Sequence, residues 1–260
     1  MRKASLRELD LTDFEPSRQN LSVKSFKESF GSSGRLNSEY YQPKYDEIVD
    51  KVKNYKGGYQ TLGYFSKSYS TGYPYKSKSY VADGIYLIRI NNIKQGQLDV
   101  SNATKIPSLD IDLSPKDVAI ENDILISMSG TIGNSCKIPH GISAVTNQRI
   151  MKITPQNIGL ELLPLLINSI IGQYQLEKIG TGGVQTNISS GDILNILIPI
   201  IDENIQTQIE QNIRQSFKLK EQSKELLKVA KTAVEIAIES GEDMGLEYIK
   251  NSAKEKRSDD

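Results

Sequence analysis

The segment from 203 to 239 constrains the fold more than any other part of the chain. Its apolar residues Ile205, Ile209, Ile213 and Phe217 are four apart, and the series resumes at three- and four-residue spacing further on. This pattern predicts one helix, which at 1.5 Å per residue would be roughly 55 Å long. Because its apolar stripe is narrow, we expect the helix to pair with another long helix, in the same or another chain. The alternative is a helix that folds back onto its own domain.

The part of the chain from about 60 to 155 has a different texture, with short β-branched runs between turn residues. Three segments are predicted as strands: 84–93, 118–130 and 142–154. Helices are predicted on both sides of this part, at about 43–55 and at about 162–179. A last short strand is expected at LNILIPI, before the long helix.

These patterns predict the α+β class, with a mixed α/β domain followed by a long C-terminal coiled-coil-type helix. Four regions are expected: an irregular N-terminal arm (1–37), the domain with its lead-in helix (38–200), the long helix (201–242) and a frayed tail (243–260).

Reactive side chains are few. One cysteine, Cys136, and one histidine, His140, cannot build the usual Cys/His zinc site. No glycine-rich segment carries the lysine of a nucleotide-binding P-loop. The inventory therefore favours a binding protein without cofactors, although an enzyme working through Ser, Asp and Lys alone stays open. A lone cysteine and the lack of an apolar run of ~20 residues predict a cytoplasmic protein with no membrane contact.

The stretch 51–80 is purely basic and rich in tyrosine. It holds six lysines, no acid and seven of the thirteen tyrosines, whereas the whole chain balances 32 basic against 32 acidic residues. Lysines neutralise phosphates, and tyrosines can stack or donate a hydrogen bond, so the stretch suits contact with a nucleic-acid backbone. The alternative is a solvated basic face with tyrosines packed at its edge.

Candidate contact residues lie in this stretch and in two later segments. Arginine can read the guanine edge, and hydroxyls on a glycine turn suit phosphates. The candidates are Tyr73, Tyr75, Lys76, Lys78, Arg89, Ser129 and Thr131. The alternative for Arg89 is a strand residue paired with an acid. Gly130 and Gly133 are expected to need a positive φ.

Five other polar residues, Asn147, Gln148, Arg149, Gln185 and Asn187, could touch DNA as well. The amides and the arginine can pair with base edges. We favour a structural role for all of them, in which they hold loops in place.

Three segments, read together with the long helix, resemble a known family. They are 70–99, 117–153 and 180–200, and SEYYQPKYDEI is similar to the family's lead-in. In this order they resemble the DNA-specificity (S) subunit of type I restriction–modification systems, over about 36 to 242.

The resemblance implies a non-catalytic subunit whose target recognition domain reads one half of a split double-stranded DNA target. Modification subunits would grip the helix and methylate adenine N6, and a restriction/motor subunit would join them. S-adenosylmethionine, ATP and Mg are then expected only on those partners. The chain lacks the [DN]-P-P-[YF] tetrapeptide of adenine methyltransferases.

The chain holds one recognition domain, so the resemblance implies a half-size form that homodimerises through the long helix. It could equally be half of a longer product. The rival hypothesis is a helical interaction or scaffold protein without DNA binding.

Overall fold

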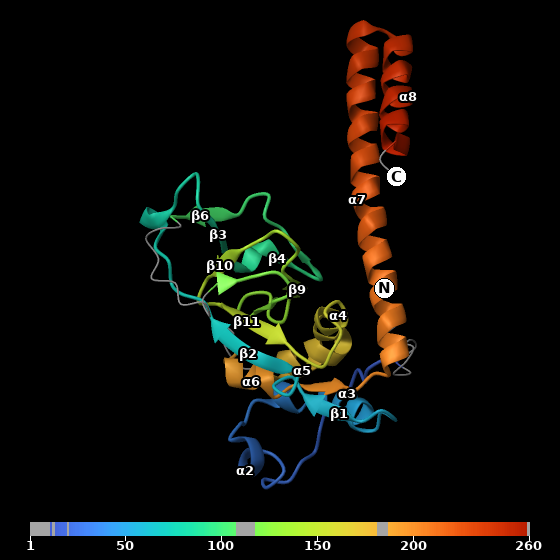
Figure 1. Ribbon diagram of the computed structural model, residues 1–260. Coiled ribbons are helices and arrows are strands. Elements are labelled where there is room, and N and C mark those ends of the chain that lie inside the picture. The colour runs from blue at the N-terminus through green and yellow to red at the C-terminus, as the bar shows by residue number, and fades with distance from the viewer. Residues whose placement is uncertain (1–10, 12–13, 20, 108–117, 181–186, 259–260) are drawn as a thin grey trace. The chain divides into compact units, whose positions relative to one another are not determined.

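The computed structural model describes residues 11, 14–19, 21–107, 118–180 and 187–258 (Figure 1). The chain divides into two compact units, Arg2–Glu210 and a second unit from Gln211 to the C-terminus. The first unit mixes short strands and helices, and the second is helical. The predicted α+β class with a long C-terminal helix is confirmed.

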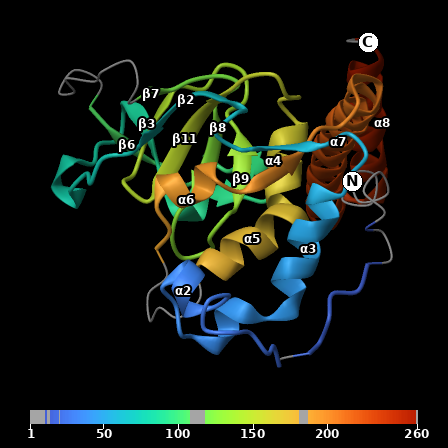
Figure 2. The ribbon, with the colours of Figure 1, turned by 90° about the horizontal axis from the view of Figure 1, so that it is seen from below.

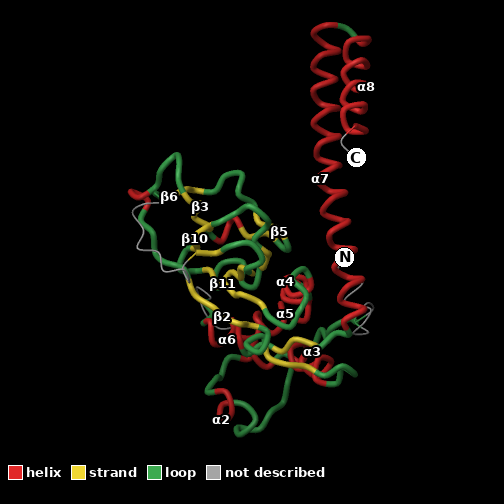
Figure 3. The backbone as a smooth tube through the Cα atoms, in the orientation of Figure 1, coloured by secondary structure: helices red, strands yellow, loops and turns green. Residues whose placement is uncertain are grey.

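Two four-stranded sheets form the centre of the first unit (Figure 3). The first sheet has the order β6 (Thr104–Ile106), β3 (Ile85–Ile88), β10 (Ala144–Thr146) and β7 (Val118–Ala119). The second has the order β2 (Ser66–Thr71), β11 (Ile150–Pro155), β8 (Ile124–Ser127) and β9 (Ser135–Lys137). Only the β3–β10 pair is parallel within these two sheets. Two small antiparallel pairs complete the strands: β1 (Tyr59–Thr61) with β12 (Leu197–Pro199), and β4 (Ile93–Lys94) with β5 (Gln97–Leu98).

Each of the three segments predicted as one strand contains two strands. The prediction was wrong in each case because it missed the break between them. The segment 118–130 holds β7 and β8, and 142–154 holds β10 and β11, so each crosses from one sheet to the other. The segment 84–93 holds β3, a 3-10 turn (η3, Ile90–Asn92) and β4. Asn122 makes one break with a φ of 71°. Both halves of each run are largely buried, so the sequence reads as one apolar strand.

Helices cover one end of the sheets (Figure 2). Helix α3 (Pro43–Lys53) confirms the lead-in helix, with Tyr45, Ile48 and Val52 on its buried face. The predicted helix at 162–179 is two, α4 (Leu162–Asn168) and α5 (Ile170–Gly180). Ser169 separates them in an extended conformation, where its hydroxyl donates to Leu166 O and accepts from Ile171 N–H. A further short helix, α6 (Ser190–Leu194), is capped by Ser189 and Asp192.

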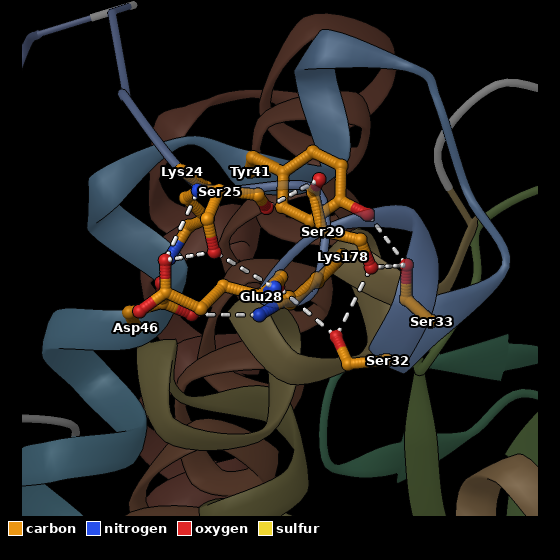
Figure 4. Close-up of polar contacts among 9 residues, drawn as sticks. All are labelled: Lys24, Ser25, Glu28, Ser29, Ser32, Ser33, Tyr41, Asp46 and Lys178. Carbon is orange, nitrogen blue, oxygen red and sulfur yellow. Dashed lines mark hydrogen bonds and ion pairs between the residues drawn. The ribbon is translucent and has the colours of Figure 1, made fainter.

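The described part of the N-terminal arm contains one short helix, α2 (Phe30–Ser33), and is anchored to α3 and α5 by polar contacts (Figure 4). Lys24 on the arm and Lys178 on α5 both donate to Asp46 on α3, at 2.9 and 2.7 Å. Burial alone would raise the pKa of Asp46, but the hydrogen bonds from the two lysines outweigh it and lower that pKa. The arm also holds α5 directly, because Arg35 donates to the Ile179 carbonyl at 2.9 Å.

The long helix α7 (Glu203–Ser240) starts in the first unit, where Gln206 and Glu210 accept backbone hydrogen bonds from Gly159 and Glu161. In the second unit the chain reverses at Gly241 and continues as α8 (Glu242–Ser258), antiparallel to the end of α7 (Figure 1).

The prediction of a frayed tail at 243–260 was therefore wrong for all but the last two residues, which lie outside the described ones. Gly245 permits the contact, since a Cβ there would lie 2.7 Å from the Ala233 carbonyl oxygen and 2.9 Å from Ala237 Cβ. At 1.5 Å per residue α8 spans about 26 Å and α7 about 57 Å, so α8 lies beside less than half of its partner.

An apolar stripe stays exposed along α7. It consists of Leu219, Leu226, Leu227, Val234 and Ile238. Across the described residues, no helix combines the length and apolarity that a bilayer span requires.

Candidate nucleic-acid interface

Backbone hydrogen bonds bring three distant segments of the first unit together. The Tyr73 N–H donates to the Thr146 carbonyl at 3.0 Å, and Tyr73 forms a parallel bridge with Asn147. The Asn147 N–H donates to the Ile88 carbonyl at 2.9 Å. The tyrosine-rich loop, the end of β3 with Arg89 and the crossover after β10 are therefore direct neighbours.

The two tyrosines of the loop have different roles. Tyr75 is half-buried and packs against the core of Leu87, Ile106 and Val145. Its ring lies 5.2 Å from the ring of Tyr73, edge to face, and Tyr73 is 64% exposed. Tyr75 thus anchors the loop while Tyr73 protrudes from it. Two exposed lysines follow: Lys76, which precedes the 3-10 turn η2 (Ser77–Ser79), and Lys78, which lies on it.

The turn after β8 is held from within. Gly130 and Gly133 have φ values of 69° and 77°, which confirms their predicted conformation. The Ser127 hydroxyl donates to the Thr131 carbonyl, and the Thr131 side chain stays exposed. Ser129 is only 3% exposed, and its hydroxyl accepts a hydrogen bond from Arg149 Nη1 at 3.3 Å. Of the two candidate hydroxyls, only that of Thr131 is therefore presented to a ligand.

Arg149 ties this turn to the segment before α6. Its Nη1 also donates to Asn187 Oδ1 at 3.0 Å, and its own N–H donates to Asn147 Oδ1 at 3.3 Å. These three residues have the loop-holding contacts that the sequence favours for them. Gln148 is exposed, and Gln185 lies outside the described residues.

Arg89, Thr131 and Asn147 line one cavity of about 590 Å³. Its polar lining comprises Arg89, Asn91, Lys94, Thr131, Asn134 and Asn147. Sequence reasoning missed Asn91, Lys94 and Asn134. The one signal for Lys94 in the sequence was Gly96, two residues later, which is typical of a hairpin turn. In the structure Gly96 has a φ of 81°.

The side chain of Arg89 has no acidic partner among the described residues. Its backbone N–H donates to Asn92 Oδ1 at 2.9 Å, which fixes the start of η3. Its guanidinium carbon lies 6.0 Å from the centre of the Tyr80 ring, and its Nε is buried without a hydrogen-bond partner. The alternative in which Arg89 pairs with an acid is thus not seen there.

Two further cavities are each lined by a cationic side chain that has a partner within the protein. One, of about 380 Å³, is lined by Lys152, whose Nζ lies 3.6 Å from Asp123 Oδ2 and donates to the Val118 carbonyl. The other, of about 300 Å³, is lined by Arg149 and Asn187, which bond to each other. Within the described ranges, no group of three or more His, Cys, Asp or Glu side chains could hold a metal ion.

Comparison with known proteins gives one relationship in sequence. No family model matches the chain. Over 140 residues, or 53% of its length, the chain is 27% identical to the specificity subunit of the type I restriction enzyme EcoBI from Escherichia coli, of which it covers 29%.

Two solved structures resemble the chain more distantly. The type I restriction–modification S subunit of M. genitalium has a TM-score of 0.48 at 13% identity, over 70% of this chain and 43% of that one. The HsdS subunit of Thermoanaerobacter tengcongensis has a TM-score of 0.45 at 17% identity, over 68% and 44%. Over about half of its length, the chain is therefore similar in sequence to the specificity subunit of a type I restriction enzyme, and it spans less than a third of that subunit.

Proposed function

We propose that this chain is a DNA-recognition subunit of a type I restriction–modification complex, and that it reads one half of a bipartite double-stranded target. One observation carries the proposal. The lysine- and tyrosine-rich loop is fixed by main-chain bonds beside the cavity that holds Arg89, Thr131 and Asn147. Exposed cations and protruding aromatic and amide groups on one face are the groups that contact phosphates and base edges.

Different residues of this face have different roles. Lys76 and Lys78 attract and neutralise backbone phosphates, which gives affinity without sequence information. Tyr73 protrudes from the loop and enters a groove. The chain binds and does not catalyse, and the adenine-N6 methyl transfer belongs to partner subunits, together with S-adenosylmethionine, ATP and Mg.

Partner docking is assigned to the long helix. The exposed apolar stripe on α7 supports contact with a second helix, since such surfaces on soluble chains mark interaction sites. We propose that methyltransferase subunits and a second copy of this chain bind there. A restriction/motor subunit joins through the methyltransferase subunits. A twofold pair then presents two recognition domains to a palindromic split site.

A pair of lysine substitutions tests the DNA role. Lys76→Ala with Lys78→Ala should weaken binding of the assembled complex to every duplex and reduce the slope of log K against log salt by about two for each copy of the chain, because each lysine neutralises one phosphate. The measurement is a fluorescence-anisotropy titration at several salt concentrations. The matched control is Lys51→Ala with Lys53→Ala, which removes two exposed lysines of the same basic stretch from the end of α3.

The rival scaffold function predicts another result. If the complete complex with methyltransferase subunits prefers no duplex over a random one, the DNA role is wrong and the helical interaction role remains. An unchanged salt slope in the double variant would instead move the phosphate contacts away from Lys76 and Lys78.

A further inference from the structure

The cavity around Arg89 differs from the rest of the binding face in shape and charge. We propose that it holds a single phosphate of the DNA backbone, with Arg89 as the residue that binds it and thereby sets the register of the recognition domain on the duplex. This inference rests on the proposed function and deepens it, because it assigns a ligand to one site within the face.

The charge of the cavity indicates an anion. Among the described residues, Arg89 and Lys94 both line it, no Asp or Glu does, and neither cation has an ion pair. The other two cavities differ in this respect. There Lys152 is paired with Asp123, and Arg149 is bonded to Ser129 and Asn187. Of the three, only the Arg89 cavity combines two cations with an arginine nitrogen, Nε, that lacks a hydrogen-bond partner within the described ranges.

The state of the guanidinium favours a bound anion. Arg89 is half-buried, and its Nε is shielded from water without an acceptor in the described part of the chain. A buried donor without a partner is costly, and an unpaired charge more so. An anion beside the guanidinium would offset this cost. The exposed side chains of Thr131 and Asn91 add neutral donors at the same cavity.

Shape separates a phosphate from a base. Base edges lie inside the grooves and are reached by side chains that protrude, whereas phosphates project outward from the duplex. A hollow of about 590 Å³ therefore receives a projecting phosphate, and the protruding Tyr73 is the neighbour that can enter a groove. The guanine contact expected for Arg89 from the sequence is replaced by a positioning contact.

The experiment combines a substitution with modified DNA. Duplexes that carry one neutral methylphosphonate at successive positions are titrated with the complex containing the wild-type chain or Arg89→Gln. At one position in each half of the target the modification should weaken binding of the wild-type complex by about tenfold and binding of the variant complex by less than about twofold, because two changes that remove the same interaction are not additive. On unmodified DNA the substitution should weaken binding to every sequence alike and lower the salt slope by about one for each copy of the chain.

Arg18→Gln is the matched control, since it removes the same charge from an exposed position on the N-terminal arm and should leave both readouts unchanged. Lys94→Gln should lower the salt slope as Arg89→Gln does. It leaves Arg89, and therefore the start of η3, unchanged. Thermal melting of each variant verifies that it is folded.

Three results would overturn the inference while DNA binding itself survives. The first is a loss of preference at one base pair with an unchanged salt slope, which makes Arg89 a base reader. The second is additivity at every methylphosphonate position. The third is binding of inorganic phosphate that depends on Arg89, together with no coupling between Arg89 and any phosphate of the duplex. The cavity would then be a site for free anions. A wild-type complex that binds no duplex would overturn the proposed function as well.

Discussion

Cys136 shows how a single residue reports on the core. Its thiol is fully buried among Ile88, Leu125 and Ile150, and burial raises its pKa to about 12. The thiolate is the reactive form of cysteine, so in the folded chain this residue is both shielded and protonated. A lone cysteine indicated from sequence the absence of an internal disulfide, but its burial depends on the two sheets that enclose it.

We expect the Cys136 thiol to react with a disulfide reagent at pH 8 only when the chain opens. The native rate should be at least a hundredfold lower than the rate in denaturant, because a pKa raised from about 9 to about 12 leaves about a thousandth of the thiolate. Absorbance of the released thiol measures both rates. Native and denatured rates that agree would mean that the core around Cys136 is open.

At the same scale, Arg89 marks the limit of sequence reasoning at the site. Tyr73, Tyr75, Lys76 and Lys78 can be nominated from sequence as contact candidates, because the composition of the stretch around them is unusual. The direction of Arg89 cannot, since the alternation around it ends where β3 gives way to η3. The sequence also predicts that the Ser129 hydroxyl is available to a ligand, whereas in the structure Arg149 donates a hydrogen bond to it. A partner twenty residues away cannot be inferred from local spacing.

The sequence predicts helices and strands well where only one face of the element is buried. It predicts them poorly where the residues on both sides of a break are buried. Helix α3 has a clear stripe, and its predicted limits agree with the observed ones to within two residues. The runs at 118–130 and 142–154 each resemble a single strand, because the residues on both sides of each break are apolar and buried in different sheets. The breaks are made by polar residues of ordinary appearance, such as Asn122 and Asn147.

Asp46 links three elements, and its removal should release one of them. Asp46→Asn keeps the shape of the side chain but loses both ion pairs, so the arm should detach and be cleaved several times faster by trypsin at Lys24 and Lys27. Mass spectrometry of the fragments measures this. Asp50→Asn, an exposed carboxylate on the same helix, is the control. Equal cleavage of all three proteins would show that Arg35 and the rest of the arm hold it without Asp46.

The same contact predicts a pH dependence of the arm. The pKa of Asp46 is lower in the folded chain than in the unfolded chain, where it is about 3.9. The stabilisation is therefore complete above about pH 4 and is lost as the pH falls through the lowered value. Hydrogen exchange of the arm amides should accelerate in that range beyond its intrinsic pH dependence, and in Asp46→Asn this extra acceleration should be absent.

For the whole molecule, the length of the C-terminal segment was predictable and its reversal was not. A strict three- and four-residue spacing identified α7. The turn at Gly241 and the helix after it escaped prediction, because α8 is highly charged and its contact with α7 depends on a glycine packed against Ala233 and Ala237. α8 supplies the long helix's partner over part of its length and leaves the stripe from Leu219 to Ile238 exposed.

Oligomeric state is the prediction at this scale. The chain of 29.0 kDa should sediment as a dimer, and Leu226→Glu with Leu227→Glu should make it a monomer, because two charges would be buried in the apolar contact. Analytical ultracentrifugation over a concentration series measures the mass. Lys224→Gln with Lys228→Gln shifts the net charge equally on another side of α7 and should stay dimeric. A monomeric wild-type chain would contradict the proposed pairing.

The loops of the binding face are joined through main-chain atoms, from Tyr73 to Thr146 and from Asn147 to Ile88. Such bonds do not depend on which side chains the loops carry. A framework of this kind tolerates exchange of its outward-facing residues one at a time without rebuilding the path of the chain. Under the proposed function, new target sequences can therefore arise by point substitution on an unchanged scaffold, which would make this face a suitable starting library for selecting altered DNA preferences.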